Sequence, residues 1–310
     1  MPVVVDRRGF LGALPVAACL SRLPVAAADP APAPFSLGFS LYGMNGLPLA
    51  EALQACADIG YRDVEPALMP GFSAEPATLS AAARGELRNR LAGLNLAVPA
   101  VMENLRPVVP DDAAHQANLE ALKRAAELLH DLSPRRPAIV ETVLGGKPNE
   151  WPTLRGALVE RLGAWAEVGR RHDLVVAAKA HVSNALHTPD DAAWLVEQVA
   201  SPHLRLAFDY SHFQLQGFPL TESLEKLLRY TVFIHVKDAR GTAQNVEFLL
   251  PGQGTVDYDQ YFRLLRRRGY AGSVTVEVSA MLHKRPDYDP RAAARSSYAA
   301  LKTAFDRTNF

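Results

Sequence analysis

Short apolar runs alternate with longer segments of helical periodicity eight times along this chain, and this repetition constrains its fold more than any other feature. The runs are apolar on both faces, as in Leu174 to Ala178. That pattern is typical of buried parallel strands rather than half-exposed antiparallel ones. Eight strand and helix units of this kind close into a (β/α)₈ barrel of about 250 residues. We therefore predict an α/β fold with one barrel domain.

The repeat assigns each strand and helix to a stretch of sequence. The predicted strands are Phe35 to Tyr42, Asp63 to Ala67, Ala97 to Met102, Ala138 to Val143, Leu174 to Ala180, Leu204 to Asp209, Val232 to Val236 and Ser273 to Val278. The predicted helices cover residues 47–59, 77–93, 112–132, 151–172, 189–200, 221–229, 257–268 and 289–307. An open, doubly wound sheet is disfavoured, because no Gly-x-Gly-x-x-Gly follows the first strand.

The charge balance limits the classes of partner. The chain has 33 Lys and Arg against 33 Asp and Glu, so no overall field attracts nucleic acid or an anionic membrane. Its 48% hydrophobic and 21% charged residues are sufficient for a full globular core. We expect a small-molecule ligand, with no nucleic acid partner.

The first 28 residues are expected to be an export signal. Arg7 and Arg8 precede an apolar run at residues 12–20 and small residues up to Ala28, which resembles a twin-arginine signal peptide. We predict cleavage after Ala28, a Pro/Ala leader at 29–34, and a barrel domain at 35–310. The apolar run is too short for a stable membrane insertion. The expected location is the periplasm, reached through the twin-arginine export machinery; lipid anchoring through Cys19 is the alternative.

Charged and polar residues gather at the carboxyl ends of the predicted strands, where barrels of this type carry their functional sites. A charge directly after an apolar strand is costly to bury alone, so a ring of them indicates mutual pairing around a metal, a substrate, or both. The strand ends carry Glu65, Glu103, Glu141, Lys179, His181, Asp209, His212, His235, Lys237, Asp238 and Glu277.

Three of these residues suit a divalent cation. Asp209 and Glu277 offer hard carboxylate oxygens and His235 offers an imidazole nitrogen. This mixed oxygen and nitrogen set is typical of sites for Mn²⁺, Mg²⁺, Co²⁺, Fe²⁺ or Zn²⁺.

Several segments together resemble the xylose isomerase-like TIM barrel superfamily of sugar phosphate isomerases and epimerases. The resemblance spans the whole expected barrel domain. It implies a metal held by a Glu after strand five, an Asp after strand six, a His after strand seven and a Glu after strand eight. The last three positions correspond to Asp209, His235 and Glu277. The segments are residues 59–65, 208–212, 234–238, 251–258 and 274–277.

Lys179 departs from the family pattern, because it stands where the strand-five glutamate is expected. A protonated ammonium cannot bind a cation and repels one nearby. Three interpretations remain open. Glu141 supplies the missing carboxylate and Lys179 acts as base or donor; Lys179 replaces the metal and pairs with Asp209 and Glu277; or the barrel has lost its chemistry and only binds a carbohydrate. A buried ion pair between Lys179 and Glu141 without a catalytic role is a further alternative.

The expected function is a carbohydrate isomerase, epimerase or lyase that removes a proton next to the carbonyl of a sugar or cyclitol, assisted by Mn, Mg, Co or Zn. The alternative is a metal-free or catalytically degenerate periplasmic sugar-binding barrel. The catalytic candidates are Glu277, Lys179 and Glu141, and the metal candidates are Asp209, His235, Glu277 and Glu141. The substrate candidates are His212 and Arg240, at positions that the resemblance implies, together with His181 and Glu65.

Overall fold

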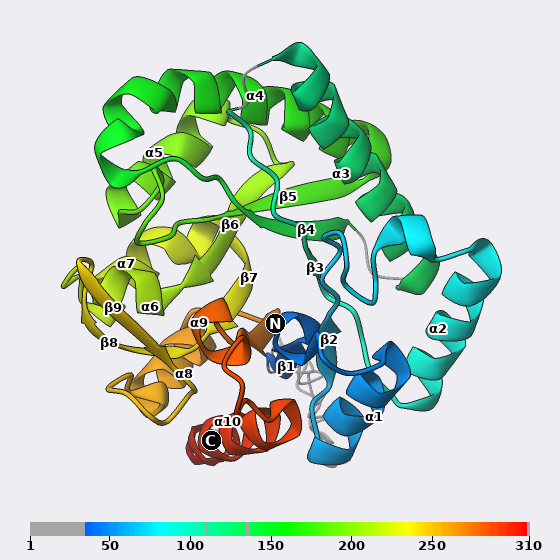
Figure 1. Cartoon of the computed structure of the whole chain (residues 1–310). Coiled ribbons are helices and arrows are strands. Elements are labelled where there is room, and N and C mark those ends of the chain that lie inside the picture. Colours follow the sequence, from blue (N-terminus) through cyan, green and yellow to red (C-terminus); the bar gives the residue numbers. More distant parts are fainter. Residues whose placement is uncertain (1–34, 109–110, 134–136, 309–310) are drawn as a thin grey trace, which may run out of the picture. The chain divides into compact units, whose positions relative to one another are not determined.

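The computed structural model describes residues 35–108, 111–133 and 137–308. Within these ranges eight parallel strands form one sheet in the order β2-β1-β10-β7-β6-β5-β4-β3. Backbone bridges from Asp63 to Ala97 and from Ala67 to Met102 connect the two ends of this sheet. Figure 1 looks along the resulting barrel, with the helices around its outside. The predicted (β/α)₈ barrel is confirmed.

The barrel strands are β1 (Ser36–Ser40), β2 (Asp63–Glu65), β3 (Val101–Met102), β4 (Ala138–Val143), β5 (Leu174–Lys179), β6 (Leu204–Asp209), β7 (Thr231–Val236) and β10 (Ser273–Val276), and a separate hairpin is made by β8 (Asp238–Thr242) and β9 (Asn245–Leu249). The helices are α1 (Leu49–Ile59), α2 (Ala81–Gly93), α3 (Asp112–Leu132), α4 (Trp151–His172), α5 (Pro189–Val199), α6 (Tyr210–Gln214), α7 (Leu220–Leu227), α8 (Tyr258–Arg267), α9 (Ala280–His283) and α10 (Pro290–Arg307). Short 3₁₀ helices are η1 (Leu41–Met44), η2 (Pro76–Thr78), η3 (Pro148–Glu150) and η4 (Leu228–Tyr230).

The expected export segment at residues 1–28, the leader at 29–34 and the alternative anchor Cys19 lie outside the described residues. Among the helices of the described ranges, none is both long and apolar enough to span a bilayer.

Most predicted elements agree with the observed ones, and the differences have local causes. Strands β4 and β6 and helices α3 and α4 have the predicted bounds. Strand β3 is much shorter than expected, because Pro99 has no N–H to donate to a neighbouring strand. Strand β1 ends early at Ser40, whose side chain accepts a hydrogen bond from the backbone N–H of Tyr42 and begins η1.

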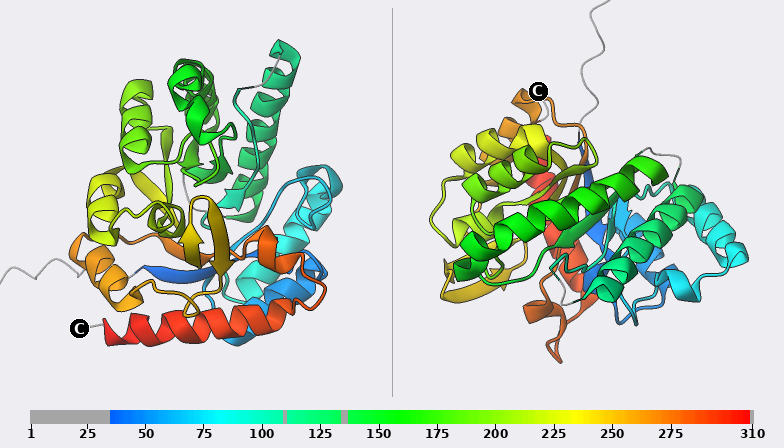
Figure 2. Two further views of the ribbon diagram at one scale, coloured as in Figure 1. Left: turned by 60° about the vertical axis from the view of Figure 1, so that its left-hand side comes forward. Right: turned by 90° about the horizontal axis from the view of Figure 1, so that it is seen from above.

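The helices begin and end where the sequence provides caps. The carboxylate of Asp111 accepts from the N–H of Ala114 at the start of α3. Gly60 ends α1 with a φ of 112°, a left-handed conformation that favours glycine. The last helix, α10, packs against α1 and α8, as Figures 1 and 2 show.

A small apolar layer inside the barrel lies beneath the functional end. It consists of Ala100, Ala177, Ala207 and Phe233, all buried. The Phe233 ring lies 5.1 Å from the imidazole of His235, two residues further along β7, in an edge-to-face arrangement. Side chains two residues apart point to the same face of a strand, so His235 points into the barrel directly above Phe233 and rests on this apolar layer.

Two elements that the sequence did not predict, the β8–β9 hairpin and α9, cover the carboxyl end of the barrel. They contact one another and lie side by side in Figure 2. The hairpin is held by a small apolar cluster that includes Phe248, Ala239, Val182 and Leu215. These two elements form much of the wall around the site.

Candidate active site

The carboxyl ends of four strands bring the candidate residues together. Lys179 is the last residue of β5 and Asp209 the last of β6. His235 lies near the end of β7, and Glu277 directly follows β10. Because parallel strands of a barrel end on the same side, these four side chains meet at one mouth.

Lys179 is buried, with 2% of its side chain exposed. Its ammonium lies 3.0 Å from Glu141 Oε1 and 3.2 Å from Glu277 Oε1. Burial alone lowers the pKa of Lys179, but the carboxylates of Glu141 and Glu277 raise it by more, and the pKa ends above its ordinary value. Lys179 therefore remains a cation at neutral pH.

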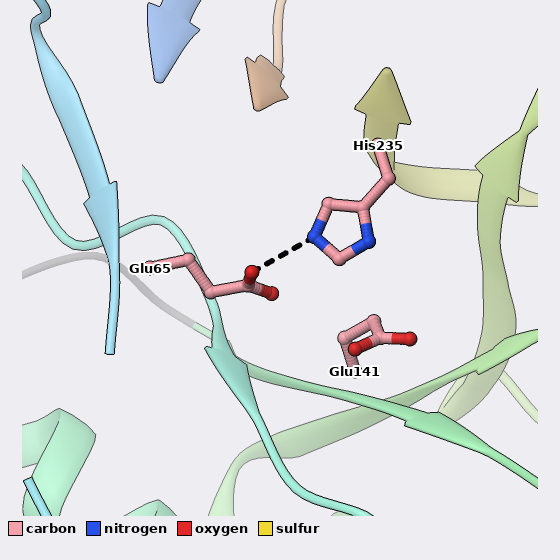
Figure 3. Close-up of side chains that lie close together, drawn as sticks. All are labelled: Glu65, Glu141 and His235. Carbon is pink, nitrogen blue, oxygen red and sulfur yellow. Dashed lines mark hydrogen bonds and ion pairs between the residues drawn. The ribbon is translucent and has the colours of Figure 1, made fainter. Parts of the chain in front are cut away.

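The ammonium of Lys179 also lies 3.0 Å from Nδ1 of His235. An ammonium can only donate, so Nδ1 is the acceptor and the ring hydrogen is on Nε2. That Nε2 lies 2.8 Å from Glu65 Oε2 and donates to it. Figure 3 shows Glu65 pointing toward the imidazole, with Glu141 near the ring, and the dashed line marks the hydrogen bond to Glu65.

A second lysine, Lys237, joins Asp209 and Glu277. Its ammonium forms a short ion pair with Asp209 Oδ2 and lies 2.5 Å from Glu277 Oε2. The hydroxyl of Ser211 donates to the other oxygen of Asp209 across 2.7 Å. Glu277 thus lies between two ammonium groups, one on each of its oxygens.

The charge state of Glu277 follows from these neighbours. Burial alone raises the pKa of Glu277, but Lys179 and Lys237 lower it by more, so that it ends well below its ordinary value. Glu277 is therefore a carboxylate at neutral pH.

Two histidines at the mouth are neutral hydrogen-bond donors. Burial and the nearby lysines lower the pKa of His181 to about 4. Burial, together with the charges of Lys237 and Lys179, also lowers the pKa of His212, to well below its ordinary value. The N–H of Ser183 donates to Nδ1 of His181 across 3.2 Å, and the N–H of Val182 donates to Nδ1 of His212 across 3.4 Å. Each ring therefore carries its hydrogen on Nε2.

These groups surround an inner cavity of about 180 Å³. Both ammonium groups, Glu277, His181 and His212 line it. The Nε2 of His212 is buried and has no hydrogen-bond partner in the described part of the chain. The carboxylate oxygen Oδ2 of Asp209 lies 3.6 Å from it. A buried donor of this kind can bind a ligand oxygen in the cavity.

The residues do not fit a divalent cation in their observed arrangement. Within the described ranges, two groups of three side chains have ligand atoms close enough to hold one: Glu65, Glu141 and His235, and Asp209, His212 and Glu277. Lys179 already contacts two members of the first group, and Lys237 contacts two members of the second. A metal ion in either group would lie beside a buried ammonium, and such charges repel strongly at short distance.

The expected metal ligands are accordingly divided. Asp209 and Glu277 belong to one group, whereas His235 and Glu141 belong to the other. His235 does approach Glu277, with Nδ1 3.6 Å from Oε2. In place of the expected single site with four ligands, the structure has two neighbouring groups of side chains, and each contains its own lysine.

Two other candidate residues lie elsewhere than expected. Arg240 is an exposed residue of β8 that contacts Glu247 and the backbone of Gln253 at 3.4 Å, and it does not line the inner cavity. Glu65 is buried beneath His235 and does not line the cavity either. Arg240 belongs to the β8–β9 hairpin, an element that strand order alone does not predict.

Asp238 has a structural role that explains the glycines of the segment at residues 251–258. Its carboxylate accepts from the N–H of Gly252 at 2.9 Å and of Gly254 at 2.7 Å. A Cβ on Gly254 would lie 2.8 Å from Cβ of Asp238, so the loop needs glycine there. Asp238 therefore holds the loop at residues 251–254 against the barrel.

Some lining residues escaped the sequence analysis. Tyr42, Asn104 and Phe248 line the inner cavity but lie in η1, a loop and the hairpin, where no charged strand end marks them. Lys237 was recognised at a strand end without a role. Its position could have indicated a role in the site. Side chains alternate between the two faces of a strand, so Lys237, two residues after His235, is expected on the same face as that histidine.

The sequence and the structure both have known relatives. Residues 53–304 match the family described as xylose isomerase-like TIM barrel. An inosose dehydratase of Bacillus licheniformis is 24% identical over 251 residues, which are 74% of this chain and 79% of that protein. An inosose isomerase of Halalkalibacterium halodurans is 28% identical over 162 residues, and the match spans 50% of this chain and 54% of that protein.

Solved structures share the fold at low identity. A probable 3-DHS dehydratase, AsbF, of Bacillus anthracis has a TM-score of 0.73 at 14% identity, covering 86% of this chain and 99% of that one. The IOLI protein with a bound zinc atom has a TM-score of 0.71 at 18% identity, covering 88% and 98%. At these identities the likeness establishes the barrel and leaves the chemistry to the site itself.

Proposed function

The chain belongs to the xylose isomerase-like TIM barrel family, and from this premise we propose that it is an isomerase, epimerase or lyase that removes a proton next to the carbonyl of a sugar or cyclitol. Relatives named inosose dehydratase and inosose isomerase support this class of chemistry. The observation that carries the proposal is the ionised carboxylate of Glu277, which lines the inner cavity between two ammonium groups.

Glu277 is the proposed base. It takes the proton from the carbon beside the substrate carbonyl, the C–H bond breaks, and its electron pair forms the enediolate. Although its pKa is low for a base, the negative charge moves only from Glu277 to the substrate oxygen. Before the transfer Lys179 and Lys237 pair with the carboxylate of Glu277, and after it they pair with the substrate oxyanion. The buried site therefore holds the same net charge before and after the transfer.

The two ammonium groups are proposed to do what a divalent ion does in a metal-dependent relative. Lys179 and Lys237 are positive, buried and fixed by carboxylates before the substrate arrives, which favours stabilisation of a developing oxyanion. The Nε2–H groups of His181 and His212 add two neutral donors from the same wall. This departs from the metal-assisted reaction expected from the sequence.

The fate of the proton separates the three reactions. Return by Glu277 to the former carbonyl carbon, after a hydroxyl proton shift, isomerises the sugar. If the hydroxyl of the next carbon instead takes that proton from Glu277 and leaves as water, its C–O bond breaks with its electron pair and the enzyme is a lyase. Epimerisation by two matched carboxylates would need a second one in the inner cavity, and among the described residues that line it Glu277 is the only carboxylate, so isomerisation and elimination are the favoured outcomes.

Solvent exchange tests the proposed chemistry. The protein is incubated with a panel of ketosugars and inososes in deuterated water, and loss of C–H signals is followed by NMR. Wild type should exchange the proton beside the carbonyl of at least one compound, and Glu277→Gln should slow that exchange by about a thousandfold. A barrel that only binds sugars would exchange none of them, and this would reject the enzymatic proposal.

Metal analysis tests the role of the lysines. Purified wild type should contain far less than one equivalent of divalent metal, and Lys179→Glu, which restores a carboxylate, should gain it when supplied with Zn²⁺ or Mn²⁺. Lys179→Gln is the matched control, since it removes the charge without adding a strong ligand. One equivalent of metal in active wild type, with activity lost to a chelator, would contradict metal replacement.

We also propose that residues 1–28 direct export through the twin-arginine machinery to the periplasm. The proposal rests on Arg7, Arg8 and the small residues before Asp29. Replacing both arginines with lysine should keep the protein in the cytoplasm of a host with this pathway, and mass spectrometry of the exported form should give Asp29 as the first residue. A lipid on Cys19 would instead support the anchored alternative.

A further inference from the structure

A second, larger cavity adjoins the proposed catalytic one. It has a volume of about 680 Å³, and Tyr42 and Asn104 line both cavities. Helix α9 borders both as well: Ala280 faces the inner cavity, whereas His283 faces the outer one. The two cavities are therefore neighbouring compartments at the barrel mouth that share lining residues.

The inner compartment is small for a whole ligand. Its 180 Å³ lies below the range of about 300 to 1,000 Å³ that is usual for ligand pockets. The outer compartment falls within that range. A molecule whose reacting part lies beside Lys179 and Glu277 would have room for a further group on the Tyr42 side, where the outer compartment adjoins the inner one.

The outer compartment presents aromatic surface. Tyr42 and Phe72 are stacked, with ring centroids 5.5 Å apart and an interplanar angle of 17°. The His283 ring meets Tyr42 edge-on, with centroids 4.6 Å apart. Neither Tyr42 nor Phe72 is fully buried, so this aromatic wall can pack against a flat ring with an apolar face.

An unused polar atom lies in the same wall. The Nε2 of His283 is buried and has no hydrogen-bond partner in the described part of the chain. Burial lowers the pKa of His283, so the ring is neutral and Nε2 can take part in a hydrogen bond with a ligand hydroxyl. Asn45 and Lys284 add exposed polar groups at the rim.

We propose that the outer compartment is a subsite for a second ring, so that the substrate is a glycoside whose carbonyl-bearing ring occupies the inner compartment. This inference rests on the proposed function for the position of the reacting ring. The second ring is an aryl group or another sugar, since each offers a flat apolar face to Tyr42 and Phe72. A free monosaccharide would leave the aromatic wall and the Nε2 of His283 without a contact.

Calorimetric binding of matched glycosides to the full-length barrel tests the subsite without requiring catalysis. The probes are methyl β-glucoside, phenyl β-glucoside and cellobiose, with the corresponding β-galactosides and lactose, each oxidised to a ketone at one hydroxyl of the non-reducing ring. We expect the two-ring probes of one series to bind about threefold to tenfold more tightly than its methyl glycoside. Tighter binding of the phenyl glycoside identifies an aryl group as the preferred second ring, and tighter binding of the disaccharide identifies a sugar.

Phe72→Ala is the diagnostic variant, because Phe72 lines the outer compartment and does not line the inner one. It should remove the advantage of the two-ring probes and leave methyl glycoside binding unchanged. Met281→Ala is the control: Met281 is on the same rim in α9 but lines neither compartment, and it should change nothing.

Three results would overturn the subsite: equal affinity of methyl and two-ring probes for wild type, equal weakening of both by Phe72→Ala, or no binding of any probe. Solvent exchange answers a separate question. If exchange is absent but Phe72→Ala still removes the two-ring advantage, the proposed function fails and the subsite stands as part of a glycoside-binding barrel.

Discussion

Lys179 and His235, which lie 56 residues apart in the sequence, are joined by a contact of 3.0 Å between the ammonium and Nδ1. The contact determines the ring tautomer, because Nδ1 must accept and Nε2 is left to donate to Glu65. Lys179 thus supplies one of the two buried positive charges of the site and also fixes the tautomer of its central imidazole.

Replacing Lys179 with methionine should both inactivate and destabilise the protein. The variant leaves Glu141 and Glu277 buried without their shared cation, and breaking a buried ion pair from one side costs about 3 to 5 kcal/mol. Activity should fall by at least a hundredfold, since a fixed positive charge is lost. Urea unfolding and the exchange assay measure the two effects. Lys179→Arg keeps the charge, and it should recover most of the stability; an equal loss in both variants would point to packing alone.

The free energy of unfolding should depend on pH through His181. Its pKa is about 4 in the folded protein, below the ordinary value of 6.5, so the unfolded chain binds more protons between these pH values. Stability is therefore fully present above pH 6.5 and falls as the pH drops toward 4, by about 3 kcal/mol for this group. His181→Gln cannot titrate, and its urea-unfolding curve should lose correspondingly less over the same range. Parallel pH profiles for the two proteins would contradict this assignment.

Gly38 should not tolerate a side chain. A Cβ at this position in β1 would lie 2.6 Å from the Thr275 hydroxyl and 2.9 Å from the Ser273 hydroxyl inside the barrel. Gly38→Ala should destabilise the protein by about 1 to 3 kcal/mol through overpacking. Gly85→Ala is the matched control in α2, where nothing lies within 4 Å of the added Cβ, and it should stabilise by up to about 1 kcal/mol. Thermal unfolding of both variants distinguishes the two environments.

Arg240 should be dispensable for the proposed reaction. It is exposed on β8 and pairs loosely with Glu247 at 3.4 Å, and pairs of this kind contribute about 0 to 1 kcal/mol. Arg240→Ala should change kcat and KM by less than about twofold, whereas His212→Phe, which removes the buried Nε2 donor, should lower kcat by at least tenfold. A large rise in KM for Arg240→Ala would show that the hairpin moves toward a bound substrate.

Much of the fold could be predicted because local sequence carries its signals. The run from Leu174 to Ala178 has no polar face, so it can only be a strand covered on both sides. Pro99 lies within the predicted strand from Ala97 to Met102 and shortens it to Val101–Met102, an effect that the sequence alone could have indicated. The β8–β9 hairpin was missed, because only β9 alternates polar and apolar residues, over just four positions, and no Asn-Gly or Asp-Gly turn joins the two strands.

The sequence by itself determined the barrel and the end of it that carries the site, because strand direction places every strand-end side chain on one side. It also marked Lys179 as the residue that departs from the family pattern. Only the tertiary structure decided how the charges are divided: Lys179 with Glu141, Glu277 and His235, and Lys237 with Asp209 and Glu277. The physical reason is that ion pairing acts over a few ångströms, whereas strand order places residues only to within a strand's width. Small differences in height and rotation therefore decide which carboxylate each lysine meets.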